Sequence, residues 1–214
     1  MCKGADVFTG IISGIGEVKS IARKGLSTRL EITCAETVET PGLGDSVAVN
    51  GVCLSVTGKN NNLVFDVVRN TLNMTNLKRL KPGSAVNMEG ALRLGDALSG
   101  HMVSGHIDAE RAIKSNRKTS RGWALDIGIC PGDERYLVAR GSIALDGVSL
   151  TVGELSRGFF RVFLIPHTLG NTTLRSKKTG DYVNVEFDMT AKYAARAKQT
   201  GSVTEEMLRE KGFV

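Results

Sequence analysis

The sequence predicts an all-β protein of two tandem, related domains followed by a C-terminal helix. Three observations predict it: an internal repeat, residues that alternate in polarity with a period of two, and an alanine-rich tail. A repeat of about 95 residues is a duplicated domain, because solenoid units are shorter, at roughly 20–50 residues. The chain of 214 residues is long enough to bury two ordinary cores.

The repeat is clearest in two stretches that match without a gap. Residues 44–56 (GDSVAVNGVCLSV) return as 140–152 (RGSIALDGVSLTV), with six of thirteen positions identical. The match continues in three further pairs of segments: 71–77 with 168–174, 86–89 with 183–186, and, more loosely, 9–12 with 104–107. Two related domains offer two related pockets, which suits a protein that handles two similar molecules at once.

Alternation in both repeats predicts β-strands with one buried face. Val52, Leu54 and Val56 alternate with Cys53 and Ser55. Turn-prone stretches separate the strands at 41–42, 58–62, 81–83 and 179–181. Short strands at such intervals, in domains of this length, predict a small closed barrel or sandwich.

The tail differs from the repeats because it is rich in alanine and basic residues. We expect an N-terminal extension at 1–6, domains at 7–97 and 98–189, and a helical segment at 190–214. A capping box at Ser202–Glu205 starts a second short helix, which Gly212 ends. This segment has no core of its own, so two packings stay open: against another subunit, or on its own barrel.

Composition excludes several classes of protein. The net charge is +6, but the basic residues are scattered and aromatic residues make up only 5%, which disfavours a single-strand nucleic-acid binder. No apolar run reaches the ~18 residues of a membrane span, and no export signal is present. The four cysteines are widely spaced without metal-ligand spacing, so we expect free thiols, no metal and a cytoplasmic protein.

The duplication serves as an internal control, since positions that differ between the halves are candidates for asymmetric chemistry. Four pairs differ in this way: Asp188 with Ala91, His106 with Ile11, Arg140 with Gly44, and Cys53 with Ser149. An aspartate, a histidine and an arginine in one half could move protons and hold a polar ring. Singly, each also has a plain explanation, as a surface charge, a turn residue or a buried thiol.

Small polar side chains share one strand face in both repeats. Cys53 and Ser55 point to one side of their strand, and Ser149 and Thr151 occupy the matching positions. This face is either the wall of a polar pocket or a solvated surface, and its occurrence in both halves favours the pocket.

These residues also carry a resemblance to a known family. The motifs are FTGII at 8–12, VNGVCL at 49–54, ALRLGD at 91–96, GHMVSGH at 100–106, DGVSLTV at 146–152 and LIPHTL at 164–169. Each motif is short, but all occur in order and in register. From Phe8 to the C-terminus the chain closely resembles the α-type riboflavin synthases, whose repeats bind lumazine.

The resemblance implies two six-stranded Greek-key barrels and a C-terminal helix that assemble as a homotrimer. The family converts two molecules of 6,7-dimethyl-8-ribityllumazine into riboflavin and 5-amino-6-ribitylaminouracil by transferring a four-carbon unit, without cofactor or metal. Each active site forms between the N-barrel of one subunit and the C-barrel of its neighbour. Lumazine synthase makes the substrate and is a candidate partner.

The resemblance implies a chemical group of Asp188, His106, Ser149, Thr151 and Cys53. We assign proton transfer to Asp188 and His106, and binding of ring and ribityl oxygens to Ser149 and Thr151. The positions implied for substrate contact are Phe8, Thr9, Gly10, Ile11, Ile12, Cys53, Leu54, Ser55, Asp66, Val67, Val68, Arg69, Asn70, Thr71, Gly105, His106, Ile107, Arg140, Ser149, Leu150, Thr151, Ile165, Pro166, His167, Thr168, Leu169 and Gly170.

The chain departs from the family pattern at a few positions. Ser55 stands for the usual Thr, Arg140 for a frequent Lys, Arg69-Asn70 for Pro-Glu and Ser99 for Gly, and six residues precede Val7. The chief alternative function is that of lumazine proteins, which share the fold and bind the chromophore without turnover. Those relatives tend to lose the Ser-Gly-His segment and the groups that break the symmetry, both of which this chain keeps.

Overall fold

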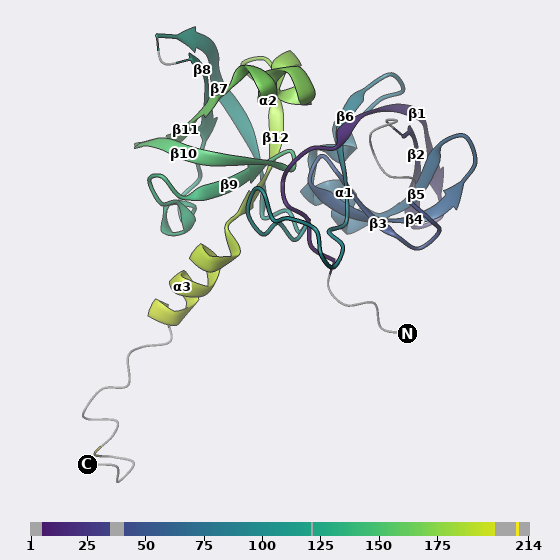
Figure 1. Cartoon of the computed structure of the whole chain (residues 1–214), viewed down its shortest axis with the longest axis horizontal. Helices are drawn as coiled ribbons and strands as arrows, with labels where there is room; N and C mark the ends of the chain where they lie inside the picture. The colour runs from purple at the N-terminus through teal and green to yellow at the C-terminus, as the bar shows by residue number, and fades with distance from the viewer. Residues whose placement is uncertain (1–5, 35–40, 121, 200–208, 210–214) are drawn as a thin grey trace.

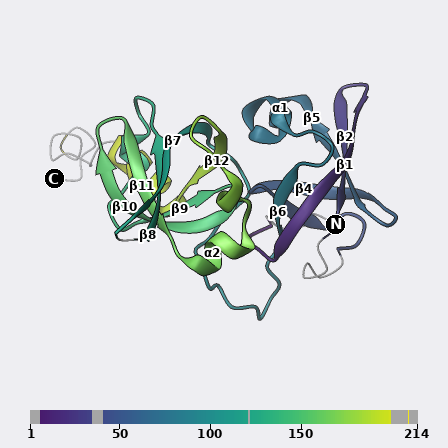
Figure 2. The same ribbon diagram turned by 90° about the horizontal axis from the view of Figure 1, so that it is seen from above.

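Two closed antiparallel barrels stand side by side, and a helix leaves the second one (Figure 1, Figure 2). This computed structural model describes residues 6–34, 41–120, 122–199 and 209. The all-β prediction of two homologous six-stranded Greek-key barrels with a C-terminal helix is confirmed. The capping box at Ser202–Glu205, the stop at Gly212 and residues 1–5 of the extension lie outside the described residues.

The N-barrel closes in the strand order β1-β2-β5-β4-β3-β6. Its elements are β1 (Gly14–Lys24), β2 (Ser27–Thr33), β3 (Ser46–Val49), β4 (Val52–Lys59), β5 (Leu63–Val68), α1 (Arg69–Met74), the 3-10 turn η1 (Asn76–Arg79) and β6 (Ala85–Gly90). The short helix and turn between β5 and β6 cover one end of the barrel.

The C-barrel repeats this plan and closes in the order β10-β11-β8-β7-β12-β9. Its elements are β7 (Ala109–Thr119), β8 (Gly122–Gly128), η2 (Glu134–Tyr136), β9 (Ser142–Leu145), β10 (Val148–Ser156), β11 (Phe159–Leu164), α2 (Pro166–Asn171), η3 (Thr173–Ser176) and β12 (Tyr182–Phe187). The helix α3 (Met189–Gln199) follows directly and projects away from both barrels (Figure 1).

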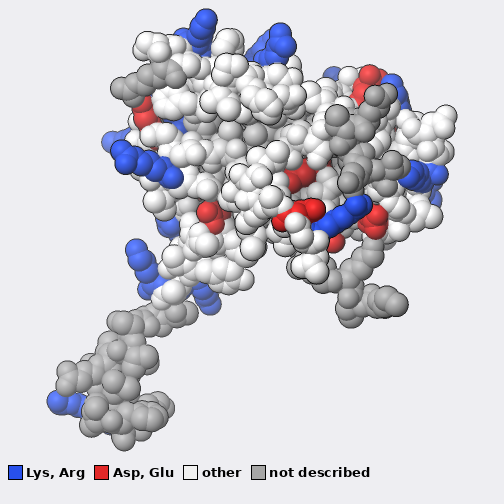
Figure 3. All heavy atoms as spheres, viewed as in Figure 1, with Lys and Arg blue, Asp and Glu red and all other residues white. Residues whose placement is uncertain are grey.

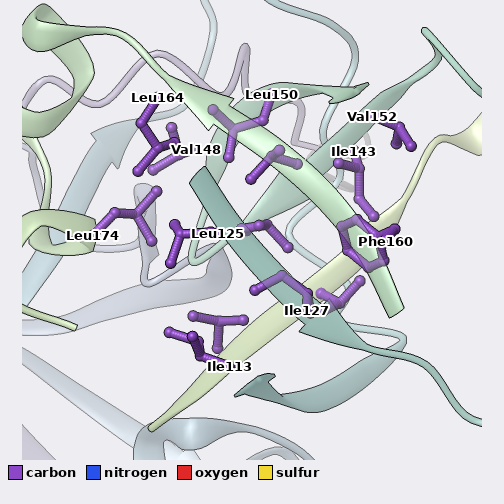
Figure 4. Packing of buried hydrophobic residues seen from close by; sticks show 14 of the residues in the cluster. Ile113, Leu125, Ile127, Ile143, Val148, Leu150, Val152, Phe160, Leu164 and Leu174 are labelled. Atoms are coloured by element: carbon purple, nitrogen blue, oxygen red, sulfur yellow. The ribbon is translucent and has the colours of Figure 1, made fainter. Parts of the chain in front are cut away.

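Each barrel is filled by the apolar face of its strands. Along β4 the buried and accessible residues alternate as predicted, with Val52, Leu54 and Val56 inside. In the C-barrel, Leu125, Ile143 and Phe160 meet from three different strands (Figure 4). Full burial of one such side chain contributes about 1.5–3 kcal/mol.

Two tight turns bring the barrels into contact. Asn50-Gly51 and Asp146-Gly147 connect β3 to β4 and β9 to β10, and all four residues have positive φ, as a type I′ hairpin turn requires. The two glycines face each other so closely that a Cβ on Gly51 would lie 2.6 Å from the nitrogen of Gly147. The absence of side chains here sets the distance between the barrels.

Around these turns lies a buried polar network that joins the barrels, which we call the asparagine network. It consists of Asn50, Asn76, Asn87, Asp146, Thr173 and Asn184, all at most 6% exposed. Its bonds come in pairs related by the repeat. Asn76 N–H donates to Asn184 Oδ1 at 2.7 Å, and Thr173 N–H donates to Asn87 Oδ1 at 2.7 Å.

The reciprocity extends to the turns themselves. Asn184 Nδ2 donates to the carbonyl of Asn50 at 2.8 Å, and Asn87 Nδ2 donates to the carbonyl of Asp146 at 2.9 Å. Each barrel therefore satisfies backbone groups that the other would leave unpaired in the interface. Asp146 carries the network's charge, and the Nζ of Lys177 lies 2.8 Å from its Oδ2 as an ion-pair partner.

We expect Gly51→Ala to destabilise the protein by on the order of 3 kcal/mol, because the new Cβ meets backbone that cannot move aside. Gly83→Ala is the matched control, since it has a similar positive φ but nothing within 4 Å of the added Cβ. It should cost only about 1 kcal/mol. Chemical denaturation of both variants checks this, and equal losses would refute the close approach.

Candidate functional site

The small polar side chains on β4 and β10 form two equivalent surfaces. We call Cys53 and Ser55 the first face, on the N-barrel, and Ser149 and Thr151 the second face, on the C-barrel. In both, the first residue is half-buried and the second is exposed. The faces therefore lie at the barrel surface, accessible to a ligand.

Each face is closed by a segment that belongs to the other half of the sequence. Gly10 accepts a hydrogen bond at 2.7 Å from the N–H of Ser149, and Gly105 accepts one at 3.0 Å from the N–H of Cys53. A Cβ on Gly10 would lie 2.6 Å from Ser149 Cβ, and one on Gly105 would lie 2.5 Å from Cys53 Cβ. Glycine is thus required at both positions. We call this arrangement, in which a segment of each half covers the face of the other, the crossed closure.

Two buried glutamates hold the closing segments in place. Glu89 accepts hydrogen bonds from the N–H and hydroxyl of Thr9, both at 2.7 Å, and from Gly10 N–H at 3.1 Å. Glu186 does the same for Ser104, at 2.7 Å for both groups, and for Gly105 at 3.0 Å. Burial raises the pKa of both carboxyls, and the hydrogen bonds oppose that rise. The two clamps fix the glycine carbonyls against the faces.

A histidine that was not predicted as a site residue, His101, lies against the second face. His101 Nδ1 lies 2.7 Å from Ser149 Oγ, and the His101 N–H donates to Thr9 O at 3.1 Å. Burial lowers the pKa of His101, while the charge of Asp188 acts in the opposite direction. The structure thus gathers a neutral imidazole, a hydroxyl and a carboxylate on one side of the C-barrel.

The first face has an acidic residue where the second has this histidine. Asp6 matches His101 in the repeat, and its Oδ2 accepts a hydrogen bond from Ser46 Oγ at 2.6 Å. The pKa of the Cys53 thiol is raised, mainly by burial and further by the charge of Asp6. A thiol that stays protonated contacts a ligand as a small apolar group and is a poor nucleophile.

The structure separates the residues predicted to transfer protons. His106 is exposed and follows Gly105 beside the first face. Asp188 lies beside the second face, where its Oδ1 accepts hydrogen bonds from the N–H and hydroxyl of Thr190 and so caps the start of α3. Within one chain, His106 therefore lies beside the face of the N-barrel and Asp188 beside the face of the C-barrel.

Arg140 occupies a strained position next to the second face. Its φ is +66°, a conformation that favours glycine, and its counterpart in the N-barrel is Gly44 with φ of +78°. The Gly44 N–H donates to the carbonyl of Val56 in β4 and the Arg140 N–H donates to the carbonyl of Val152 in β10, both at 2.8 Å. A non-glycine residue here costs of order 1 kcal/mol or more, and such strain is frequent at functional sites.

The predicted contact segments occupy equivalent places in the two barrels. Residues 66–71 run from β5 into α1, and 165–170 comprise the N-cap of α2 and all but the last residue of that helix. Val68 and Ile165, which match in the repeat, are 57% and 61% exposed and could pack on a ligand ring. Four of the predicted contact residues are instead buried in the core: Phe8, Leu54, Val67 and Leu150.

The residues that follow the two closing glycines also contact the opposite barrel. Ile12 packs against the C-barrel core, and Ile107 packs against the N-barrel core. Ile11, by contrast, is 47% exposed and lies at the position that His106 takes in the second repeat. Asp66 forms an ion pair with Arg29 at 3.1 Å, and this pair lowers the pKa of the Asp66 carboxyl. The charge of Asp66 is therefore already paired within the protein.

The described part of the chain has neither a broad basic patch on the side seen in Figure 3 nor a metal-binding cluster. Lys and Arg side chains are scattered over the visible surface without forming a continuous patch (Figure 3). Among the described residues, no group of three or more His, Cys, Asp or Glu side chains could hold a metal ion. None of the helices within the described part of the chain is long and apolar enough to cross a membrane.

Comparison with known proteins matches both repeats. A family model described as the lumazine binding domain matches residues 9–91 and 104–188. Riboflavin synthase of Bacillus amyloliquefaciens is 39% identical over 97% of this chain and 100% of its own length. The enzyme of that name from Mycobacterium tuberculosis (strain ATCC 25618 / H37Rv) is 42% identical over 89% and 97%. A crystal structure of LumP complexed with riboflavin has a TM-score of 0.75 and 26% identity, and covers 84% of this chain and 98% of LumP.

The stability of the protein should depend on pH through His101. Its pKa lies below the usual 6.5, so the unfolded chain binds a proton more readily than the folded protein. The corresponding stability is present above about pH 6.5 and is lost as the pH falls toward the folded pKa.

We therefore expect the melting temperature of the unmodified protein to fall more steeply between about pH 7.5 and about pH 5.5 than that of His101→Gln. His106→Gln changes an exposed imidazole and should behave like the unmodified protein. Parallel curves for all three proteins would rule out the assigned environment of His101.

Proposed function

Because the chain belongs to the riboflavin synthase family, we propose that it converts two molecules of 6,7-dimethyl-8-ribityllumazine into riboflavin and 5-amino-6-ribitylaminouracil. The observation that carries this function is the match to riboflavin synthases over nearly the whole chain, both repeats included. Two identical substrates suit two homologous faces, and their different roles suit the differences between those faces.

The enzyme is favoured over a chromophore-binding antenna of the same fold. Riboflavin synthases match at 34–42% identity, whereas the LumP structures match at 24–26%. The chain also keeps the groups that distinguish its halves, namely Ser149, Asp188 and the Ser-Gly-His segment at 104–106. An antenna would need only to hold a ring, so it has no use for a base beside one face.

Much of the acceleration comes from holding two planar rings in reacting geometry. The chemistry also needs a proton to leave a methyl group on an electron-poor ring, and a nucleophile to add to the neighbouring ring carbon. Loss of the methyl proton leaves an anion that is delocalised into the heterocycle, so a base of moderate strength suffices. We assign this proton transfer to the second face. There His101 is neutral and hydrogen-bonded to Ser149, and Asp188 stabilises the imidazolium that forms when His101 takes up the proton.

We propose that the complete site forms between subunits of a homotrimer, with the first face of one chain opposite the second face of the next. The separation of His106 from Asp188 within one chain supports this, because contact between faces of neighbouring chains would reunite the predicted pair. The helix α3 supports it as well, since it projects from the barrel and leaves Tyr193 71% exposed (Figure 1). We further propose a cytoplasmic enzyme that associates with lumazine synthase.

Purified protein should form riboflavin from the lumazine alone, in the presence of a chelator, with two lumazines consumed per riboflavin. We expect Asp188→Asn to lower kcat about 100-fold, since it removes the charge that assists His101. Asparagine caps a helix as well as aspartate does, so α3 should remain intact. Absorbance and chromatography of both products check this, and full turnover in Asp188→Asn would remove Asp188 from the mechanism.

Complementation tests the shared site. A variant with a damaged first face (Cys53→Trp) and one with a damaged second face (Ser149→Trp) should each be inactive as homotrimers. Mixed trimers should regain part of the activity, because some sites then combine two intact faces. The trimer itself is checked by sedimentation. Trimeric mixtures without any recovered activity would contradict a site between subunits.

A further inference from the structure

A separate pocket lies in the N-barrel, between the β1–β2 hairpin and the helix α1. It has a volume of about 380 Å³. Its apolar lining includes Ile21, Leu72, Leu77 and Leu80, and Thr28 stands at its wall. Cys53 and Ser55 do not line it, and of its lining residues only Arg69 also belongs to the predicted lumazine-contact segment 66–71, so the pocket lies beside the site proposed for the lumazine and does not coincide with it. Volumes of this size suit small-molecule ligands.

The duplication explains why the pocket is open. Thr28 pairs with Arg23 across the β1–β2 hairpin, and Trp123 pairs with Lys118 at the same place in the C-barrel hairpin. Trp123 packs against the C-barrel core, and its indole N–H bonds to Asn116 Oδ1. Where the C-barrel has an indole, the N-barrel has a threonine and an empty space.

The rim of this pocket is basic. Arg23, Arg69 and Lys78 line it, and no acidic residue is among its lining residues. Lys78 is already engaged by Glu110, with Nζ and Oε2 2.7 Å apart. Neither Arg23 nor Arg69 has a hydrogen bond or ion pair with any described side chain. Two guanidinium groups beside an apolar cavity fit a ligand that combines an apolar body with a negative charge.

We propose that this pocket binds a small planar aromatic anion, with its ring where the C-barrel places the Trp123 indole and its acidic group between Arg23 and Arg69. The ring would pack on the leucines and on Ile21 as the indole packs on the C-barrel. A carboxylate or a phosphate would serve as the acidic group, since a guanidinium binds either. The site would exist in the N-barrel alone, so one ligand binds per chain.

Indole-3-acetate is a suitable probe, because it carries the missing indole and one carboxylate. Titration calorimetry on the full-length protein should show saturable binding of one molecule per chain. Tryptamine, which replaces the carboxylate with an ammonium group, should bind at least tenfold more weakly. Saturating 6,7-dimethyl-8-ribityllumazine should not displace the probe; displacement would place the probe in the lumazine site and overturn the proposal.

Variants locate the bound probe. Thr28→Trp should abolish binding by filling the pocket as Trp123 does in the C-barrel. Arg23→Glu should weaken binding at least tenfold, while Lys118→Glu, the matched change at the equivalent hairpin position of the C-barrel, should leave it unchanged. Arg23 is exposed, so its variant decides the question even if Thr28→Trp fails to fold. Equal binding by Arg23→Glu and Lys118→Glu would overturn the proposal, as would absence of binding to the unmodified protein.

Discussion

The asparagine network between the barrels is the constraint on which the rest of the structure depends. Its members are buried side chains of two similar domains, and each satisfies backbone groups of the other. A buried polar network of this kind favours one geometry, because each hydrogen bond lost on displacement would leave a buried group unpaired at a cost of about 1–3 kcal/mol. It therefore permits one relative placement of the barrels, with Gly51 against Gly147, and excludes the sliding that a purely apolar contact would allow.

That fixed placement is what forms the two faces. Gly10 and Gly105 reach the opposite barrel only because the barrels are held at this distance, and Glu89 and Glu186 then lock the two carbonyls in place. The faces are alike in backbone and different in side chains. One has a protonated thiol and Asp6, and the other has His101, Ser149 and Asp188. A shared framework with unlike groups lets identical substrates take unlike roles.

Much of this could be predicted from the sequence because the repeat gives its own alignment. Alternation along β4 and β10 predicted both strand faces, and the comparison of halves selected Asp188 and Arg140, whose roles stay predictions. The crossed closure could not be predicted, since it depends on how two barrels dock and not on a pattern within either. His101 was missed for a related reason: its counterpart, Asp6, lies before the segment where the two repeats visibly match, and only the fold reveals that the two positions are equivalent.

The reciprocal contacts also bear on how such a chain could arise. The closing bonds of Gly10 and Gly105 and four bonds of the asparagine network come in pairs that run in both directions, so a chain with a single repeat could make these bonds with a second copy of itself about a twofold axis. Such a dimer would have two identical faces, and any substitution would alter both. Fusion of two copies into one chain removes that restriction. An ancestor limited to symmetric binding could thereby acquire a histidine on one side and a cysteine on the other.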